Sequence, residues 1–273
     1  MLARCAVLGD PIAHSLSPVL HRAGYAAVGL DWEYDAVRVP EDGFTDFVRG
    51  LDAGWRGLSL TMPLKRKALG LARSVTARAA LAGAANTLVL RDGDVVLADN
   101  TDLPGAAAAV RERYDGPVRA ATVLGGGATA ASTGLAMVDL GATSVRLLVR
   151  TPDRAGEAAA AIAAHPAGPD VEVGSLADGE VLGDVVVSTI PAGAQDDALV
   201  ARCAGVPVLF EVIYDPWPTP IAAAAGDRVL VSGLDLLVHQ AVLQFELFTD
   251  VPGPLAAMRA AGEAALVARH AAP

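Results

Sequence analysis

Lysine is so rare in this chain that its position is informative. Of 21 Lys and Arg residues, only Lys65 and Lys67 are lysines. Lys65 ends the segment Gly57–Lys65, which reads as a strand followed by a proline turn. Functional groups collect at the carboxyl ends of strands in α/β sheets, so Lys65 could donate a hydrogen bond or a proton to a substrate oxygen. Lys67 is expected to point elsewhere and to be solvated.

Two carboxylates follow a later strand-like segment and could work with that lysine. Asp99 and Asp102 both lie in Ala98–Asp102, where a strand is expected to end. Either carboxylate could pair with Lys65 and hold the same hydroxyl or ketone oxygen. A turn or capping role is the alternative for each, and spacing alone does not choose between them.

Two hydroxyls precede a predicted helix near the start of the chain, within Gly9–Pro18. Ser17 is predicted to be the N-cap, with Pro18 at the first helical position. Ser15 has no expected capping duty. Two hydroxyls beside a helix N-terminus would make a pocket for a carboxylate.

A glycine-rich turn joins a predicted strand to a predicted helix in the middle of the chain. Gly125, Gly127 and Ala130 fit the pattern G-x-G-x-x-A. The first glycine permits a tight turn, the second allows a pyrophosphate to approach the backbone, and the alanine permits close packing. This pattern predicts a dinucleotide site.

The loop after the next strand distinguishes between two dinucleotides. Enzymes that use NAD usually carry an acidic residue there for the ribose 2′-hydroxyl, whereas this chain has Arg150 and Arg154. Guanidinium groups suit a 2′-phosphate through charge-assisted contacts. Asp153, between them, is expected to act as a helix cap. NADP is therefore the expected cofactor.

Strand-like and helix-like segments alternate along the chain, which predicts an α/β protein. Arg91–Asp94 is typical of a hairpin turn. A first set of elements ends near residue 102, a second begins near 103, and two long helical patterns follow from about 234. The predicted domains are residues 1–102 together with helices in 236–273, and residues 103–235. Predicted strands and helices are Ala3–Leu8, Pro18–Val28, Tyr34–Val39, Gly43–Leu51, Gly57–Leu60, Thr87–Leu90, Val95–Ala98, Ala120–Leu124, Ala128–Leu140, Ser144–Val149, Asp153–Ala164, Val185–Thr189, Val208–Val212, Arg228–Val231, Leu234–Phe248 and Pro254–His270.

Composition excludes several classes of function for the 273 residues. The net charge of −10 argues against a nucleic-acid partner, which needs a basic face. No apolar run reaches the roughly 18 residues that span a bilayer, and Met1–Gly9 reads as a first strand and not as a signal peptide. No membrane partner and a cytoplasmic location are therefore expected. Cys5 and Cys203 are too far apart for a zinc pattern, and His14 and His21 lack metal-pair spacing, so no metal is expected.

Taken together, these segments resemble the shikimate dehydrogenase family over about residues 5–250. Several separated motifs in the family's order are far more specific than any single one. The motifs are Gly9–Pro18, Thr61–Lys65, Asn86-Thr87, Asn100–Asp102, the glycine-rich loop, the Arg-Thr loop, Tyr214-x-Pro216 with Thr219-Pro220, and Gly233–Phe245 with Gln240-Ala241.

The resemblance implies an amino-terminal α/β substrate domain, a Rossmann-like doubly wound dinucleotide domain, and carboxy-terminal helices that return to the substrate domain. It implies reduction of 3-dehydroshikimate to shikimate with NADPH, a step of chorismate and aromatic amino acid biosynthesis. Lys65 and Asp102 would be catalytic, which selects Asp102 over Asp99. The substrate would be held by Ser15, Ser17, Thr61, Asn86, Tyr214 and Gln240. The cofactor would be held by Gly125, Gly126, Gly127, Ala128, Arg150, Thr151, Arg154, Thr189, Gly233 and Leu236.

Four positions depart from the family's common residues: Ser59 replaces Asn, Leu103 replaces Gly, Val149 replaces Asn and Leu236 replaces Met. A quinate or aminoshikimate dehydrogenase is therefore the close alternative. A methylene-tetrahydrofolate dehydrogenase would not explain the paired serines before Pro18. A non-catalytic NADP-binding module is the alternative from another class. The chain is expected to be a monomer or a homodimer.

Overall fold

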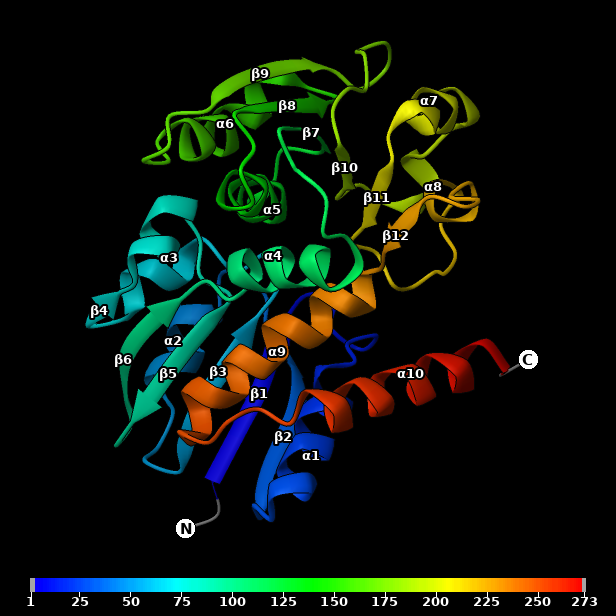
Figure 1. Cartoon of the computed structure of the whole chain (residues 1–273). Helices are drawn as coiled ribbons and strands as arrows, with labels where there is room; N and C mark the ends of the chain where they lie inside the picture. The colour runs from blue at the N-terminus through cyan, green and yellow to red at the C-terminus, as the bar shows by residue number, and fades with distance from the viewer. Residues whose placement is uncertain (1–2, 272–273) are drawn as a thin grey trace. The chain divides into compact units, whose positions relative to one another are not determined.

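The computed structural model describes residues 3–271, with the backbone alone at 154, 270 and 271. The described chain divides into two compact units (Figure 1). Unit 1 comprises the residues up to Thr101 and those from Leu237 onward, and unit 2 comprises Asp102–Leu236. Each unit is built on its own β-sheet, so each is described by itself.

Within the described residues, six strands form the sheet of unit 1, in the order β2-β1-β3-β5-β6-β4. β1 pairs in parallel with β2 and β3, whereas β3, β5 and β6 pair antiparallel. The antiparallel half follows from the hairpin turn, where Asp92 and Gly93 have positive φ. The sheet is therefore mixed. Its strands are β1 Ala3–Gly9, β2 Trp32–Arg38, β3 Trp55–Leu60, β4 Ser74–Val75, β5 Thr87–Arg91 and β6 Asp94–Asp99.

The helices of unit 1 come from both ends of the chain, and the α1 and α10 helices pack against each other (Figure 1). A Cβ added to Gly57 on β3 would overlap the ring of Phe248 on α9, so the α9 helix lies close on this sheet. The carboxy-terminal helices thus return to the first unit, as predicted. The helices are α1 Ser17–Val28, α2 Phe44–Arg49, the 3₁₀ helix η1 Lys67–Leu71, α3 Ala77–Ala82, α9 Gly233–Thr249, whose first turn belongs to unit 2, and α10 Leu255–Ala271.

Six described strands form the sheet of unit 2, in the order β12-β11-β10-β7-β8-β9, and all its pairs are parallel. This is the doubly wound arrangement that the alternating pattern predicts. The strands are β7 Ala120–Leu124, β8 Ser144–Val149, β9 Asp170–Ser175, β10 Val185–Ser188, β11 Val208–Glu211 and β12 Val229–Val231. The helices are α4 Asp102–Arg113, α5 Ala128–Asp139, η2 Pro152–Ala155, α6 Gly156–Ala163, η3 Ala192–Ala194, α7 Asp197–Arg202, η4 Cys203–Gly205 and α8 Pro220–Ala223.

Several elements of unit 2 are absent from the sequence-based assignment: the short helices α7, α8, η3 and η4, the strand β9 and the helix α4. β9 is an edge strand whose side chains are mostly exposed, so it carries no buried apolar run. α4 begins at Asp102 and contains Pro104 in its first turn, where proline is tolerated. The expected helix Asp153–Ala164 begins as the 3₁₀ helix η2.

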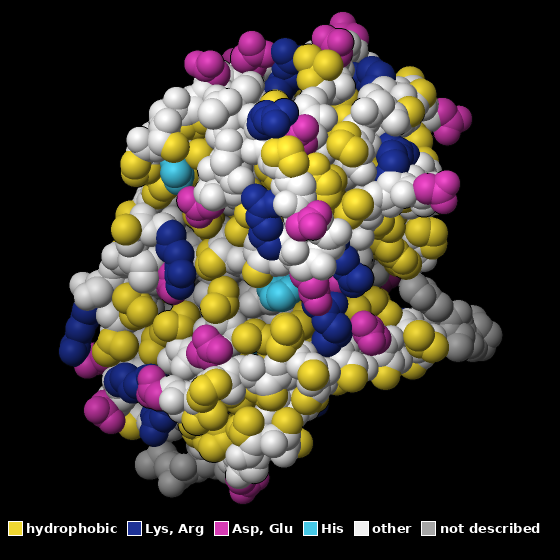
Figure 2. Space-filling model, in the orientation of Figure 1, with side chains coloured by type: hydrophobic (Ala, Val, Ile, Leu, Met, Phe, Trp, Pro, Cys, Tyr) yellow, Lys and Arg dark blue, Asp and Glu magenta, His cyan; other side chains and the backbone are white. Residues whose placement is uncertain are grey.

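Surface charges are mixed. On the face drawn in Figure 2, Lys and Arg are interspersed with Asp and Glu. Among the described helices, none is both long and apolar enough to cross a membrane.

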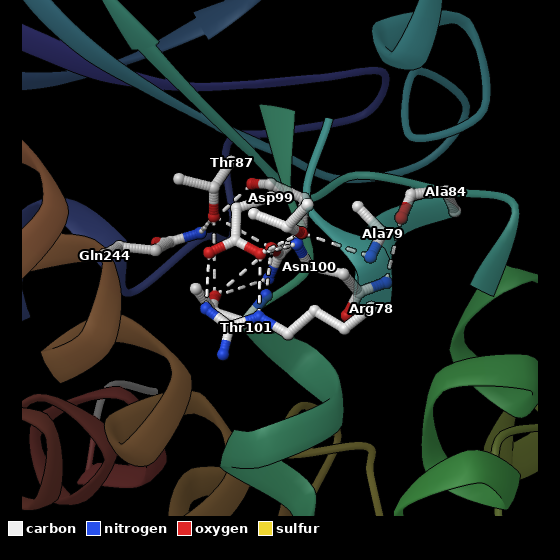
Figure 3. A network of polar contacts seen from close by, with 10 residues as sticks. Arg78, Ala79, Ala84, Thr87, Asp99, Asn100, Thr101 and Gln244 are labelled. Atoms are coloured by element: carbon white, nitrogen blue, oxygen red, sulfur yellow. Dashed lines mark hydrogen bonds and ion pairs between the residues drawn. The ribbon is translucent and has the colours of Figure 1, made fainter. Parts of the chain in front are cut away.

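A buried carboxylate, Asp99, anchors the end of β6 (Figure 3). Arg78 of the α3 helix forms an ion pair with it, and Thr76 donates a hydrogen bond at 2.6 Å. The backbone N–H of Asn100 donates another at 2.7 Å. Burial by itself raises the pKa of Asp99, but the hydrogen bonds and charge of Arg78, with the bonds from Thr76 and Asn100, lower the pKa overall. The carboxylate is thereby committed to holding α3 and β6 together.

This anchor makes a pH-dependent contribution to stability. Because the folded-state pKa of Asp99 is lowered, its contribution is present above the ordinary pKa of about 4 and is lost as the pH falls through the lowered value. We expect Arg78→Met to lower the free energy of unfolding by about 2 kcal/mol at pH 7, because it leaves the buried carboxylate with only its hydrogen bonds from Thr76 and Asn100. The difference from wild type should shrink below about pH 4, measured by urea unfolding between pH 7 and pH 3.5.

Arg73→Met is the matched control, because Arg73 and its partner Asp94 are both exposed. It should change stability by less than about 0.5 kcal/mol. A penalty for Arg78→Met that stays constant over the whole pH range would contradict the assignment to Asp99.

Candidate active site

The loops that follow β1 and β3 lie side by side. The N–H of Asp10 donates to the carbonyl of Met62 at 3.0 Å, and the N–H of Thr61 donates to the carbonyl of Leu8 at 2.9 Å. A Cβ at Gly9 would overlap the methyl group of Thr61. Glycine at this position therefore lets the loop with the paired serines approach the loop with the lysine.

The paired serines lie where α1 begins, but their local roles differ from those predicted. Leu16 is the N-cap, and Ser17 makes no side-chain capping bond. Instead, the Ser15 hydroxyl accepts a hydrogen bond from the backbone N–H of Ser17 at 3.3 Å. The prediction that Ser17 caps the helix was wrong, because the helix begins one residue earlier and the Ser17 side chain is buried.

Lys65 lies in the turn after β3, and its backbone is fixed beside a second polar residue. The carbonyl of Lys65 accepts a hydrogen bond from the N–H of Ala85 at 2.8 Å, next to Asn86. The Lys65 side chain is half-buried. Lys67, by contrast, extends its ammonium group to the carbonyl of Glu41 at an exposed position, 2.8 Å away.

Asn86 is buried at the centre of a polar cluster in unit 1. Its Oδ1 accepts hydrogen bonds from the Thr87 hydroxyl and from the Thr101 backbone N–H, both at 2.8 Å. Its Nδ2 donates to Thr101 Oγ1 at 2.9 Å and to Gln240 Oε1 at 3.3 Å. Gln240 comes from α9, so a residue 154 positions away completes the cluster.

One edge of the unit 1 sheet thus gathers most of the residues predicted to bind substrate. The register places Ser59 opposite Thr87 and Thr87 opposite Asp99, so the carboxyl ends of β3 and β6 and the start of β5 share this edge. The predicted residues placed in unit 1 are Ser15, Ser17, Thr61, Lys65, Asn86 and Gln240.

Asp102 and Tyr214, the other predicted contacts, belong to unit 2. Asp102 is the first residue of α4, and its side chain is buried. It directly follows Thr101, whose backbone is bonded to Asn86. Tyr214 is half-buried in the loop after β11.

The glycine-rich loop of unit 2 has the geometry that its sequence predicts. Gly125 has φ +121°, a conformation open to glycine and rarely adopted by other residues. A Cβ there would overlap the hydroxyl of Thr189, which donates to the carbonyl of Leu124 at 2.8 Å. Thr189 therefore lies against the loop, at the end of the neighbouring strand β10.

The loop leads directly into the amino terminus of α5. Gly127 is the N-cap, and a Cβ there would meet nothing within 4 Å. Gly126 packs on Ala155, and Ala128 begins the helix. The first turn of a helix carries N–H groups without helical partners and the positive end of the dipole. This open, glycine-lined helix start fits a dinucleotide pyrophosphate.

Arg150 and Thr151 follow β8 and are exposed. They adjoin the loop at the carboxyl end of the strand next to β7, where a dinucleotide's ribose lies in doubly wound folds. The side chain of Arg154 lies outside the described residues.

The predicted nicotinamide segment begins at Gly233. A Cβ there would overlap the carbonyl of Val212, so this glycine allows close approach to the loop after β11. Asp235 accepts hydrogen bonds from the backbone N–H and the hydroxyl of Ser232, and it forms an ion pair with Arg113 at 2.8 Å. These contacts hold the segment that contains Leu236.

A buried carboxylate of unit 2, Glu211, lies under the same loop. It accepts hydrogen bonds from Gln195 at 2.7 Å, from Thr219 at 2.8 Å and from the N–H of Ile213 at 3.0 Å. Burial raises the pKa of Glu211, although these bonds oppose the increase. The carboxylate therefore ties together the loops that flank Tyr214.

Several residues of the unit 1 cluster escaped the sequence analysis. Tyr34 and Gln244 are fully buried and hydrogen-bonded to Ser59, and neither was identified from the sequence. Gln244 lies four residues after Gln240, on the same face of α9. A second glutamine at this spacing within an apolar helix was the available signal.

His21 contributes apolar packing to the same region. Its ring stacks on Tyr34 with centroids 4.1 Å apart, and burial lowers its pKa to about 3, although the neighbouring Gln244 side chain opposes the shift. The imidazole is therefore neutral at physiological pH. Among the described residues, no cluster of three or more His, Cys, Asp or Glu could hold a metal ion.

Known proteins resemble this chain along nearly its whole length. Residues 7–88 match the family described as "Shikimate dehydrogenase substrate binding domain", and residues 233–261 match "Shikimate 5'-dehydrogenase C-terminal domain". A shikimate dehydrogenase (NADP(+)) of Methylobacterium radiotolerans is 38% identical, over 89% of this chain and 90% of that protein. One from Desulfitobacterium hafniense is 31% identical, over 96% and 97%.

Solved structures agree with the sequence relatives. The shikimate dehydrogenase of Mycobacterium tuberculosis superimposes with a TM-score of 0.87 at 40% identity, covering 96% of this chain and 99% of that one. The Thermus thermophilus enzyme in complex with NADP(H) and shikimate gives a TM-score of 0.81 at 27% identity, covering 97% and 100%. With sequence identity above 30% across almost the entire length, this chain belongs to the shikimate dehydrogenase family.

Proposed function

We propose that the protein is an NADP-dependent shikimate dehydrogenase, an oxidoreductase that reversibly reduces 3-dehydroshikimate to shikimate. The reaction is a step in the biosynthesis of chorismate and the aromatic amino acids. The observation that carries this proposal is full-length similarity, at 31–38% identity, to curated enzymes of that name.

The alternative activities have weaker support. Quinate dehydrogenase from Corynebacterium glutamicum in complex with NAD is only 23% identical, so its TM-score of 0.84 supports the fold alone. Four family residues are replaced, at Ser59, Leu103, Val149 and Leu236. These replacements leave Lys65 and Asp102 in place.

The substrate carboxylate is assigned to Ser15, Ser17 and Tyr214. Thr61, Asn86 and Gln240 are assigned to the ring hydroxyls. Support comes from unit 1, where the loops bearing the serines and Thr61 are joined by backbone hydrogen bonds and Asn86 contacts Gln240. Buried amides and hydroxyls that are already hydrogen-bonded to one another are pre-organised to recognise a polyhydroxylated ring.

Lys65 and Asp102 are assigned to the reacting oxygen. The ammonium group of Lys65 can donate a hydrogen bond to the ketone and stabilise the negative charge that develops on its oxygen. The Asp102 carboxylate can accept a hydrogen bond from the product hydroxyl at the same oxygen, and together the two groups manage the proton that this oxygen gains on reduction and loses in the reverse reaction. The backbone bond from Ala85 to Lys65 fixes the turn from which the lysine extends.

NADP is the cofactor, and when bound it supplies or accepts the hydride at the carbon. The pyrophosphate is assigned to Gly125, Gly126, Gly127 and Ala128 at the start of α5. Arg150, Thr151 and Arg154 are assigned to the adenosine ribose and its 2′-phosphate. Thr189, Gly233 and Leu236 are assigned to the nicotinamide side. A cytoplasmic location and the choice between monomer and homodimer remain predictions from the sequence.

The activity is tested by the initial rate at 340 nm with purified protein, using shikimate and quinate, each with NADP and with NAD. Rapid turnover of shikimate with NADP alone is expected. Preference for quinate or NAD would instead indicate the activity of a paralogue. Absence of turnover with all four pairs would favour the non-catalytic NADP-binding module.

The catalytic role of Lys65 is tested by substitution. Lys65→Ala should lower kcat at least about 100-fold, with a much smaller change in KM for shikimate, because its hydrogen bond strengthens as charge develops in the transition state. Lys67→Ala is the control, since the Lys67 ammonium group donates to the exposed carbonyl of Glu41. Equal turnover by Lys65→Ala and wild type would refute catalysis by this residue.

Arg150 is tested through cofactor preference. Arg150→Ala should raise KM for NADP about 10-fold and leave KM for NAD within about twofold, because a charge-assisted contact to the 2′-phosphate is lost. Arg146→Ala on β8, the strand that precedes Arg150, is the control, since Arg146 pairs with Glu172 at 2.6 Å. A parallel rise in both KM values would instead indicate a general disturbance of the loop.

A further inference from the structure

We propose that Tyr34, Ser59 and Gln244 are positioning residues that fix the side-chain amide of Asn86 in one orientation. In this orientation, the Asn86 NH₂ group, and not its carbonyl, is the group turned toward Gln240 and the substrate. The inference rests on the proposed function and deepens it, because Asn86 is assigned there to a ring hydroxyl.

The orientation originates at a backbone carbonyl. The carbonyl of Asn86 accepts hydrogen bonds from the N–H of Leu60 at 2.7 Å and from Gln244 Nε2 at 3.0 Å. A carbonyl oxygen can only accept, so Gln244 must present its NH₂ group to it. This requirement fixes which end of the Gln244 amide carries the donor.

The other end of Gln244 then determines two hydroxyl protons. Gln244 Oε1 must accept, so the Ser59 hydroxyl donates its single proton to it at 2.6 Å. Ser59 can then only accept from Tyr34, whose hydroxyl lies 2.5 Å away. Burial raises the pKa of Tyr34, so the phenol keeps its proton and remains a donor throughout the working pH range.

Gln244 also constrains Asn86 through the hydroxyl of Thr87. The second hydrogen of Gln244 Nε2 points to Thr87 Oγ1 at 3.0 Å, so Thr87 donates its own proton to Asn86 Oδ1 at 2.8 Å. The backbone N–H of Thr101, which can only donate, also bonds to Asn86 Oδ1 at 2.8 Å. Two fixed donors therefore hold Oδ1, and Nδ2 lies on the side of Gln240.

Because these side chains are buried, reversing the direction of their hydrogen bonds would cost free energy. Tyr34 and Thr87 have no exposed surface, and Ser59 and Gln244 are nearly as buried. A buried donor or acceptor without a partner costs about 1–3 kcal/mol, so a flipped amide would strand several groups at once. The ring of Tyr34 is held by the stacked ring of His21.

Two consequences follow for the substrate. Asn86 Nδ2 directs its two hydrogens to Thr101 Oγ1 and Gln240 Oε1, and the bond to Gln240 is the longer at 3.3 Å, so a ring hydroxyl would accept a hydrogen bond from Asn86 in place of Gln240. Ser59, where the family commonly has asparagine, has its proton committed to Gln244 and serves as the junction between Tyr34 and Gln244.

The experiment compares Gln244→Met, Tyr34→Phe, Ser59→Ala and Ser59→Thr with a matched control. Tyr25→Phe removes the same atom from an equally buried tyrosine of the same aromatic cluster, whose hydroxyl makes no hydrogen bond to the described residues and lies outside the Tyr34–Ser59–Gln244 chain. Measurements are kcat, KM for shikimate and for NADP, the Kd of shikimate by calorimetry, and Tm.

Gln244→Met should raise both KM and Kd for shikimate about 10-fold, with KM for NADP within about twofold of wild type. Tyr34→Phe and Ser59→Ala should raise KM for shikimate about threefold, whereas Ser59→Thr, which keeps the hydroxyl, should restore it. Tyr25→Phe should leave KM for shikimate unchanged, and it should not lower Tm, because the hydroxyl that it removes is buried without a partner in the described part of the chain. Equal effects of Tyr25→Phe and Tyr34→Phe on KM, or losses that only follow Tm, would overturn the inference.

Nuclear magnetic resonance separates this inference from the proposed function. In the wild-type protein, the Asn86 NH₂ protons should show nuclear Overhauser contacts to the Gln240 side chain, and Gln244→Met should weaken them. If wild type did not turn over shikimate, the proposed function would fail, and this measurement would still decide the orientation of Asn86. Unchanged contacts in Gln244→Met would refute the role of Gln244.

Discussion

Asn86 is held from both sides through its backbone, and the organisation of unit 1 depends on that constraint. Its N–H donates to the carbonyl of Asp99 at 3.1 Å, and its carbonyl accepts from Leu60 and Gln244. The ends of β3 and β6 and the α9 helix thus meet at the backbone of one residue. Buried peptide groups must be paired. Displacement of any of these elements would therefore leave a buried backbone group of Asn86 without its hydrogen-bond partner, at a cost in free energy.

The carboxy-terminal return of the chain serves the same constraint. α9 brings Gln240 and Gln244 to Asn86, while Phe245 and Phe248 of the same helix bury their rings in unit 1. Burial of apolar side chains drives the packing of α9 onto unit 1. The hydrogen bonds of the two glutamines fix the rotation of the helix about its axis. Packing and polar recognition are therefore set by one helix, in which Gln240, Gln244 and Phe248 share a face at a spacing of four residues.

Unit 2 obtains its geometry by more local means. At Gly125 a positive φ turns the chain sharply, and the start of α5 follows within three residues. Gly126 and Gly233 each remove a side chain where backbone or another residue passes close by. Such features depend on short-range sterics, which explains why a short motif in the sequence announces them.

The sequence by itself determined the α/β class, the returning helices, the family and the position of the glycine-rich turn, because periodicity, glycine sterics and motif order are local properties. It missed β9, whose exposed edge has no apolar pattern, and it placed the cap of α1 at Ser17 when the helix begins beside Leu16. Only the tertiary structure decided that Asp99 forms an ion pair with Arg78 and that hydrogen bonds link Tyr34 to Ser59 and Ser59 to Gln244. Those contacts join residues 21 to 185 positions apart, and hydrogen-bond direction is set by partners that no local pattern reveals.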